Sequence, residues 1–148
     1  MEKEDIRLMI GNVKFGCRAV GVIIKDDKIL FQKRKNDANW ALPGGAIATL
    51  ETGETKATIE RPLWFTEYFF NFDNKTQHQY ILGYLVNIPA DSKLLESEEF
   101  NGIEPGKDII YKWIDKKDIK DSPIKPDFLK EKLTNIKDTY EHIVENDL

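Results

Sequence analysis

Hydrophobic and polar residues alternate in short runs along most of this chain, and these runs predict β-strands. Residues 15–35 contain two such runs, joined by a turn at Asp26-Asp27. Both faces of the first run are apolar, which is typical of a central strand. Residues 63–72 and 78–88 are rich in aromatic and β-branched side chains. The turn-forming residues 73–75 between them predict a second antiparallel pair.

The C-terminal part of the chain has a different periodicity, which predicts a helix. Apolar residues recur at spacings of three and four from Leu129 to Ile143, and on a helix they form one stripe. Pro126 suits the first position of a helix, where a missing N–H costs nothing. We therefore expect a C-terminal helix over about residues 126–146.

The remaining segments complete a predicted α+β fold. Residues 89–108 contain two prolines and two glycines and predict a loop, with a short helical turn near residues 96–100. Residues 108–115 predict a further strand. Helices on both faces of a mixed sheet of five or six strands would form an α/β/α sandwich. We expect residues 1–148 to form a single domain, with its core over about residues 15–136.

Composition and charge exclude several classes of function. The net charge is −4, and no basic stretch suggests binding to nucleic acid. Cys17, His78 and His142 are too few for a Cys/His zinc site, and a single cysteine fits a reducing compartment. No apolar run reaches the roughly 20 residues that span a bilayer, and the acidic N-terminus is unlike a signal peptide. We expect a cytoplasmic protein without nucleic-acid or membrane partners.

The segment W-A-L-P-G-G at residues 40–45 is the first candidate for chemistry. A proline followed by two glycines permits a tight turn. Backbone N–H groups of Gly44 and Gly45 could bind a phosphate there, or the pair could simply close the turn. Arg34 ends the strand before this segment. It is a candidate contact for the same phosphate, or else an ordinary surface charge.

Four glutamates and one tyrosine are further candidates. Glu51 and Glu54 could bind Mg²⁺ or Mn²⁺ through their carboxylates, or be solvated loop residues. Glu60 could be a catalytic carboxylate like Glu54, or a surface residue at the start of a strand. Glu67 lies inside an aromatic strand, so its carboxylate must be at an edge, paired or in a binding site. Tyr68 could stack against a base or pack in the core.

In its order of segments the chain resembles the Nudix hydrolases, the MutT-like family. Residues 29–54 resemble the entrance to the catalytic region, with W-x-L-P-G-G and a glutamate loop. Residues 61–86 resemble the following strand pair, and residues 111–128 resemble the end of the domain. The resemblance spans about residues 18–135. It implies a Nudix-like sandwich that hydrolyses nucleoside diphosphate derivatives or related organic pyrophosphates with Mg²⁺ or Mn²⁺.

One segment departs from the family pattern, G-x5-E-x7-R-E-U-x-E-E-x-G-U, in which U is a bulky apolar residue. The family's helix places several glutamates on one face, where they share the metals. Gly45 and Glu51 satisfy the first half, and Glu54 offers an alternative register. The second half has no counterpart, and Pro62 disfavours a helix there. Compared with the family, roughly three or four helical turns are missing between Glu54 and Leu63.

These departures leave three hypotheses open. The first is a hydrolase whose activity is in question. The second is a non-catalytic sensor of a nucleotide or metabolite, favoured by Gln79, because the resembling subgroup usually has a metal-binding glutamate at that position and an amide is a poorer ligand. The third is a protein-interaction module, in which a sheet face exposed by the lost helix would favour a homodimer.

Overall fold

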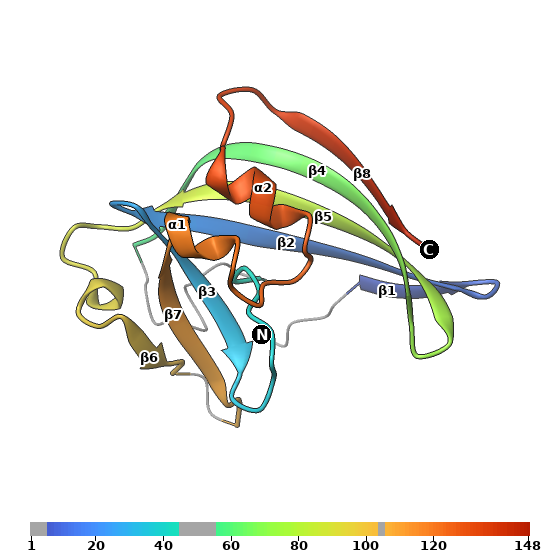
Figure 1. Ribbon diagram of the computed structural model, residues 1–148, viewed down its shortest axis with the longest axis horizontal. Coiled ribbons are helices and arrows are strands. Elements are labelled where there is room, and N and C mark those ends of the chain that lie inside the picture. Colours follow the sequence, from blue (N-terminus) through green and yellow to red (C-terminus); the bar gives the residue numbers. More distant parts are fainter. Residues whose placement is uncertain (1–5, 45–55, 104–105) are drawn as a thin grey trace.

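The computed structural model describes residues 6–44, 56–103 and 106–148. These residues form eight strands in one mixed sheet and three short helical segments, which confirms the predicted α+β class (Figure 1). The strands are β1 (Ile6–Ile10), β2 (Val13–Lys25), β3 (Lys28–Arg34), β4 (Thr58–Phe72), β5 (Lys75–Asn87), β6 (Glu99–Asn101), β7 (Ile109–Asp115) and β8 (Glu141–Asp147). The helical segments are the 3₁₀ turn η1 (Lys93–Leu95) and the helices α1 (Lys116–Ile119) and α2 (Leu129–Thr134).

Both predicted hairpins are present in the sheet. Its strand order is β6-β7-β3-β2-β5-β4-β8, and β1 pairs with β2. The β2–β5 and β4–β8 pairings are parallel, whereas β2 with β3 and β4 with β5 are antiparallel. The β4–β5 turn places Asp73 at φ 53° and Asn74 at φ 58°. A two-residue turn with both residues in this left-handed region matches the twist of the flanking strands.

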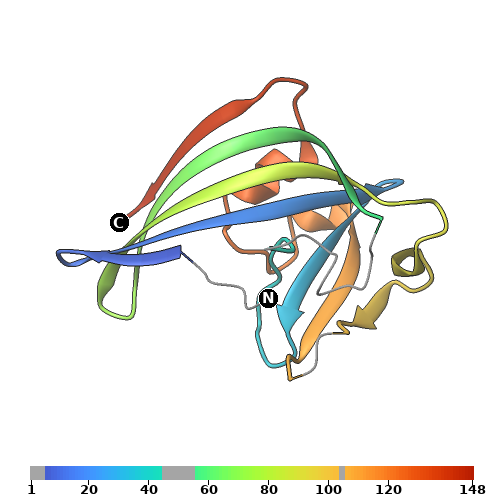
Figure 2. The same cartoon turned by 180° about the vertical axis from the view of Figure 1, so that it is seen from behind.

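The sheet divides at the β2–β3 hairpin, and this division shapes the functional site. β2 and β3 are paired only next to their turn, at Ile24↔Ile29 and Lys25↔Lys28. Beyond these pairs β2 follows β5, and β3 follows β7 along its whole length. The two strands therefore diverge and enclose a wedge, which is visible from both sides of the molecule (Figures 1 and 2).

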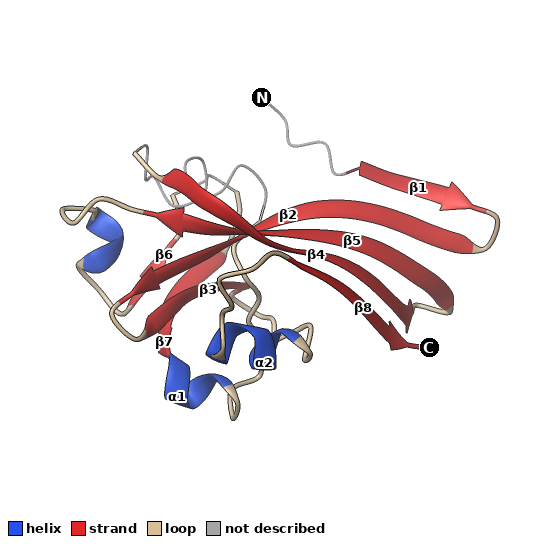
Figure 3. Ribbon diagram, turned by 90° about the horizontal axis from the view of Figure 1, so that it is seen from above, coloured by secondary structure: helices blue, strands red, loops and turns tan. Residues whose placement is uncertain are grey.

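Two hydrophobic clusters pack on opposite faces of the sheet. Successive strand residues point to opposite faces, so Val22 belongs to the first cluster and Ile23 to the second. In the first cluster α1 and α2, which lie on the same side of the sheet, bury Ile119 and Leu129 against the strands (Figure 3). In the second cluster η1 contributes Leu94. In the described chain both α-helices therefore lie on one face of the sheet, and the other face carries the 3₁₀ turn η1.

The predicted C-terminal helix over residues 126–146 is wrong. α2 ends at Thr134, and the chain returns as β8, which pairs in parallel with β4. Tyr140 of the predicted stripe is 55% exposed, whereas Ile143 is 9% exposed as a strand residue. The free edge of β4 offers unpaired backbone groups, and β-branched residues such as Ile143 and Val144 favour the extended conformation. Backbone pairing with β4 therefore outweighs the helical spacing.

The predicted helical turn at residues 96–100 is also wrong. A 3₁₀ turn forms earlier, where the Ser92 hydroxyl accepts a hydrogen bond from the Leu94 N–H and Leu94 is buried. Trp113 fixes this turn by donating from Nε1 to the Leu94 carbonyl oxygen at 2.8 Å. Phe100 then lies in β6, opposite Tyr111 of β7. The local structure is therefore determined by the burial of Leu94 and by the pairing of β6 with the edge of β7.

The described chain after residue 55 enters β4 directly, in agreement with the prediction that Pro62 prevents a helix. β4 begins at Thr58, and its pairing with β5 shifts register between Ile59 and Arg61 and again between Pro62 and Trp64. Proline is tolerated in a strand at such irregularities, because no ladder hydrogen bond is needed there. No helix in the described part of the chain has the length and hydrophobicity required to cross a bilayer.

Candidate functional site

Residues 41–44, the A-L-P-G part of the motif, form a strap across the wedge between β2 and β3. On one side, Ala41 and Gln32 of β3 exchange two backbone hydrogen bonds of 2.8 Å. On the other side, the Pro43 carbonyl oxygen accepts from the Gly21 N–H at 2.9 Å, and Gly44 pairs with Val20 of β2. The strap therefore ties the two diverging strands together and closes one end of the wedge.

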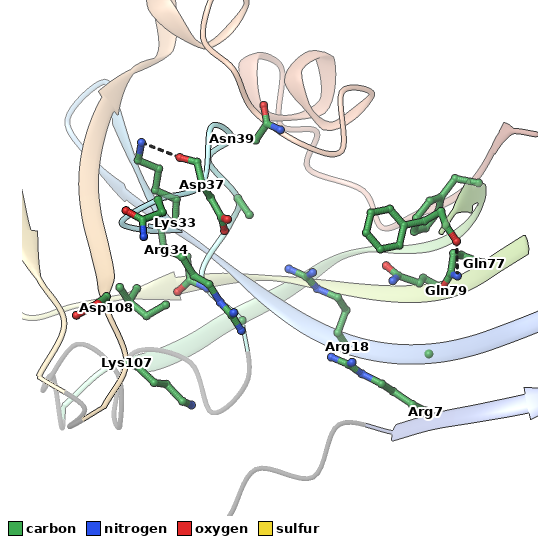
Figure 4. A pocket seen from close by; sticks show the side chains of 18 of the residues that line it. Arg7, Arg18, Lys33, Arg34, Asp37, Asn39, Gln77, Gln79, Lys107 and Asp108 are labelled. Carbon is green, nitrogen blue, oxygen red and sulfur yellow. Dashed lines mark hydrogen bonds between the residues drawn. The ribbon is translucent and has the colours of Figure 1, made fainter. Parts of the chain in front are cut away.

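Next to the strap the wedge opens into a cleft of about 1100 Å³ (Figure 4). One wall comes from β1 and β2, and the other from the end of β3, the loop after it and the start of β7. The Lys35 N–H donates to the Asp108 carbonyl oxygen at 2.8 Å, which holds the β3 loop against the entry to β7. The described chain thus builds the cleft mainly from strands and from segments hydrogen-bonded to them.

Positive charge dominates the described lining of the cleft. Seven basic side chains face two carboxylates. In a cleft with low-dielectric walls, charges of one sign add up and attract a ligand of the opposite sign. The site is therefore suited to an anion with several negative charges. The basic residues are Arg7, Lys14, Arg18, Lys33, Arg34, Lys35 and Lys107, and the acidic residues are Asp37 and Asp108.

Two of the cations can be placed relative to the W-A-L-P-G-G motif. The Lys33 ammonium donates to the Asp37 carbonyl oxygen at 3.1 Å and lies 4.9 Å from the centre of a Trp40 ring. Arg18 lies beside the strap, since a Cβ added to Gly44 would be 3.9 Å from Arg18 Nη2. The guanidinium is thus next to the Pro-Gly turn, where the sequence predicts a phosphate site.

Uncharged polar side chains also belong to the lining, beside several apolar ones. Gln77 and Gln79 of β5 line the cleft beyond Arg7 and Arg18 (Figure 4), and Gln77 Nε2 donates to the Phe72 carbonyl oxygen at 3.4 Å. Gln32 also lines the cleft, and its buried Oε1 has no hydrogen-bond partner among the described residues. A buried acceptor without a partner is costly. A ligand N–H or O–H group would satisfy it.

The structure places the predicted site residues in three different settings. Arg34 and Gly44 line the cleft. Gly45, Glu51 and Glu54 lie outside the described residues. Glu60, Glu67 and Tyr68 are not in the described lining of the cleft. Glu60 is exposed on β4, at the register shift that follows Ile59.

Glu67 lies between two histidines on the sheet face opposite the one that carries Gln77 and Gln79. Its Oε2 lies 3.1 Å from Nε2 of His142 on β8, and its Oε1 lies 3.8 Å from Nε2 of His78 on β5. Of the settings considered for a carboxylate in this strand, the structure shows the paired one. We therefore assign Glu67 a role in joining β4 to its two neighbouring strands.

Tyr68 points to the face that carries the cleft but is covered by α2. Its ring packs edge-on against Phe128, and its hydroxyl donates to Asp147 Oδ2 at 2.9 Å. Burial and then this hydrogen bond raise the pKa of the Tyr68 hydroxyl to about 12. These contacts join Tyr68 to the C-terminal strand, and a substrate contact for Tyr68 stays a prediction.

The sequence-based prediction missed the cations on the β1 and β2 wall. Arg18 had a usable signal, because it is the single charged residue within the apolar run from Phe15 to Ile24. A charge in a central strand requires a partner or a site. Arg7 and Lys14 had no such signal, since their segment was not predicted to be part of the sheet.

The described side chains do not fit a Mg²⁺ or Mn²⁺ centre. Such ions require several oxygen ligands directed at one point. Within the described ranges, no group of three or more histidine, cysteine, aspartate or glutamate side chains could hold a metal ion. The described cleft carboxylates, Asp37 and Asp108, are outnumbered by cations. Glu51 and Glu54 therefore stay as predicted ligands, untested by the described geometry.

Comparison with solved structures shows what kind of fold this is. The mutator MutT protein from Bacillus halodurans matches 88% of this chain and 90% of its own, with a TM-score of 0.50 and 11% sequence identity. The fold is therefore Nudix-like, of the MutT type. At this identity the likeness concerns the fold alone.

Two further solved structures match less well. A UDP-X diphosphatase matches 86% of this chain with a TM-score of 0.47 and 15% identity, and the chain spans 66% of that protein. The E. coli ORF135 protein matches 84% of this chain and 90% of its own, with a TM-score of 0.41 and 13% identity. No protein-family model and no curated protein matches the sequence.

Proposed function

We propose that this chain is a Nudix-type cytoplasmic protein that binds a nucleoside diphosphate derivative, or a related organic pyrophosphate, in the cationic cleft and hydrolyses it. The observation that carries the proposal is the excess of basic side chains in a cleft bounded by the A-L-P-G strap of a Nudix-like fold. A diphosphate has several negative charges in a small volume, so its binding requires such an excess.

Arg34 is the proposed main contact for the diphosphate. It ends β3 at the mouth of the cleft and is exposed. A guanidinium can donate two parallel hydrogen bonds to phosphate oxygens, which makes such contacts strong and directional. Arg18, beside Gly44, is positioned to donate to an oxygen that approaches the strap.

Binding without hydrolysis is a second candidate, and the donor set favours it. The described carboxylates do not form a metal centre, and Glu60 is not among the described residues that line the cleft. Glu51 and Glu54 are the remaining candidates for Mg²⁺ or Mn²⁺ ligands. If they hold the metal, water attacks a phosphorus of the substrate; if they do not, the same cleft senses the ligand.

Calorimetry and a phosphate-release assay together test the proposal. Nucleotide sugars, nucleoside triphosphates and dinucleotides are titrated first without metal and then assayed with Mg²⁺ or Mn²⁺. We expect binding of at least one of these classes. Arg34→Gln should weaken it by about tenfold, because one charge-assisted contact contributes on the order of 1.5–3 kcal/mol.

The matched control is Lys25→Gln, which removes an exposed charge at the other end of the β2–β3 hairpin, outside the cleft lining. This variant should bind as the wild type does. Turnover that Glu54→Gln abolishes, with binding retained, supports hydrolysis. Binding with no turnover selects the sensor. Absence of binding to every class contradicts the proposal.

A further inference from the structure

β1 is an edge strand of the sheet. It pairs with β2 from Ile6↔Cys17 to Ile10↔Val13, and no other strand in the described ranges pairs with it. Figure 3 shows β1 as the outermost strand on its side of the sheet. The side of an edge strand that faces away from its neighbour presents backbone groups on which another strand can pair. This side of β1, which faces away from β2, is called the β1 edge below.

The hairpin turn determines which backbone groups of β1 face the β1 edge. The two residues between Ile10 and Val13 form the turn, and Gly11 has φ 60°. In a turn of this length the Ile10 carbonyl oxygen accepts from the Val13 N–H. Inward-facing and outward-facing residues alternate along an antiparallel strand. The backbone groups of Leu8 and Ile10 therefore face β2, and those of Met9 face the β1 edge.

The side chains at the end of β1 are apolar and exposed. Leu8, Met9 and Ile10 are 55%, 54% and 64% exposed. Arg7 is the charged residue of this strand, and it has a partner within the protein. The pairing inferred below uses the backbone of Met9 and not that of Arg7. An exposed apolar edge of this kind is a template for pairing with another chain.

The two strands that end the main strand order are protected in ways that β1 is not. β8 reads EHIVEND, and three of its seven residues are acidic. At the other end of the order, β6 has three residues. Charge and short length are two devices by which proteins prevent edge strands from pairing with other molecules. Among the edge strands of the described sheet, β1 is therefore the one best suited to pairing between molecules.

We infer that a second copy of this chain pairs with the β1 edge, antiparallel and around a twofold axis at Met9. Met9 of each copy then exchanges backbone hydrogen bonds with Met9 of the other, and Leu8 lies opposite Ile10. Arg7 lies opposite Gly11 of the other copy, where the space is open, and away from the other Arg7. Apolar side chains thus meet apolar ones without opposing like charges, as a self-complementary twofold interface requires.

Analytical ultracentrifugation from about 1 μM to 1 mM tests the inference, because this range covers weak association. The interface is small, so we expect reversible dimers within the range. Met9→Lys should weaken the dimer by at least about tenfold, because two ammonium groups then face each other. The matched control is Val144→Lys, at a 60% exposed apolar residue of β8, which should dimerise as the wild type does. Thermal unfolding of both variants checks that the fold is intact.

Disulfide trapping tests the register, in a Cys17→Ser background that removes the free thiol. Residues of a directly opposed hydrogen-bonded pair have Cα atoms about 5.5 Å apart, a distance that a disulfide can bridge. Residues two positions out of register are about 7–8 Å apart, which is too far. Met9→Cys should therefore form a cross-linked dimer on oxidation, and Leu8→Cys should not.

Three results would contradict the inference. The first is a monomer at every concentration, or a dimer that Met9→Lys leaves intact. The second is cross-linking through Leu8→Cys in place of Met9→Cys. The third is growth into larger assemblies, since one twofold pair occupies the β1 edge of both copies. The proposed function stands or falls separately, because Met9 is not in the described lining of the cleft.

Discussion

At Gly83 the packing of the core leaves no room for a side chain. A Cβ at this position would lie 2.5 Å from Cε2 and Nε1 of Trp64, which packs across β5 in the core. Gly83→Ala should therefore lower the free energy of unfolding by about 1–3 kcal/mol, the usual cost of overpacking. Denaturant unfolding followed by tryptophan fluorescence measures the change.

Gly44→Ala is the matched control for this prediction. Its added Cβ would have only ordinary contacts, at 3.5 Å from the Ala19 carbonyl oxygen and 3.9 Å from Arg18 Nη2. Its stability should stay within about 0.5 kcal/mol of the wild type. Equal stability of Gly83→Ala and Gly44→Ala would show that Trp64 can move aside.

At the level of single residues, the sequence predicted part of the site. Two predicted residues line the cleft: Gly44, which belongs to the Pro-Gly turn, and Arg34, which ends the strand before that motif. Glu67 and Tyr68 are adjacent in β4, so they point to opposite faces. Strand alternation separates them correctly, but it cannot tell which face is open and which is covered. Which face of β4 is covered depends on α2 and β8, and these elements are distant from β4 in the sequence.

Among the elements, the C-terminal segment is the instructive case. The spacing from Leu129 to Ile136 suits a helix, and Leu129 and Leu133 are indeed buried in α2. Beyond Thr134 the same spacing continues, yet the free edge of β4 binds the chain as a strand. A periodicity records which residues are apolar, and it contains no information about an unpaired edge elsewhere in the molecule.

Glu141 connects α2 to β8, and we expect it to make this junction sensitive to acid. Lys132 donates to Glu141 Oε2 at 2.8 Å, and Lys137 lies 3.2 Å from Oε1. These contacts, first that of Lys132, lower the pKa of the Glu141 carboxyl below its usual 4.5. A carboxyl with a lowered folded pKa stabilises the fold above its ordinary pKa and loses this contribution as pH falls through the folded value.

Glu141→Gln should therefore reduce stability at pH 7 and have a smaller effect at pH 3. Urea unfolding at both pH values measures the difference. Glu131→Gln, on the exposed surface of α2, serves as the control and should behave like the wild type. A loss of stability in Glu141→Gln that is equal at both pH values would show that the carboxylate charge is not the cause.

At the scale of the whole molecule, local sequence pattern determines most of the strands but not the site. Five strands, β2 to β5 and β7, and both hairpins follow from runs of alternating residues and turn signals, whereas β1, β6 and β8 were not predicted. The cleft follows from the divergence of β2 and β3 and from the strap that crosses between them. These contacts join segments that are distant in sequence. The sequence therefore predicted the Pro-Gly turn of the strap but not the cleft beside it. Homodimer formation remains a prediction.

Ligand binding should weaken as salt is added, because the attraction comes from the summed charge of the cleft. The Debye length falls from about 30 Å at 0.01 M to about 3 Å at 1 M, so screening reduces the attraction at high salt. We expect the affinity for a nucleoside diphosphate derivative to fall several-fold over this range. Calorimetry at a series of NaCl concentrations provides the measurement.

Arg34→Gln should show a weaker dependence on salt than the wild type, since one of the charges is absent. Uridine, which has no phosphate, serves as the uncharged comparison and should show almost none. If the affinity for the charged ligand were constant across the salt series, the attraction would not be electrostatic.

The residues that flank the connection 45–57 are paired with two different strands. Gly44 is attached to Val20 of β2, and Thr58 is attached to Asn87 of β5, so each end is anchored to a different strand. Added length between these anchors would not shift the register of any strand. The connection is therefore a natural place for grafting, where a foreign helix with its own carboxylates could be inserted into an otherwise unchanged scaffold.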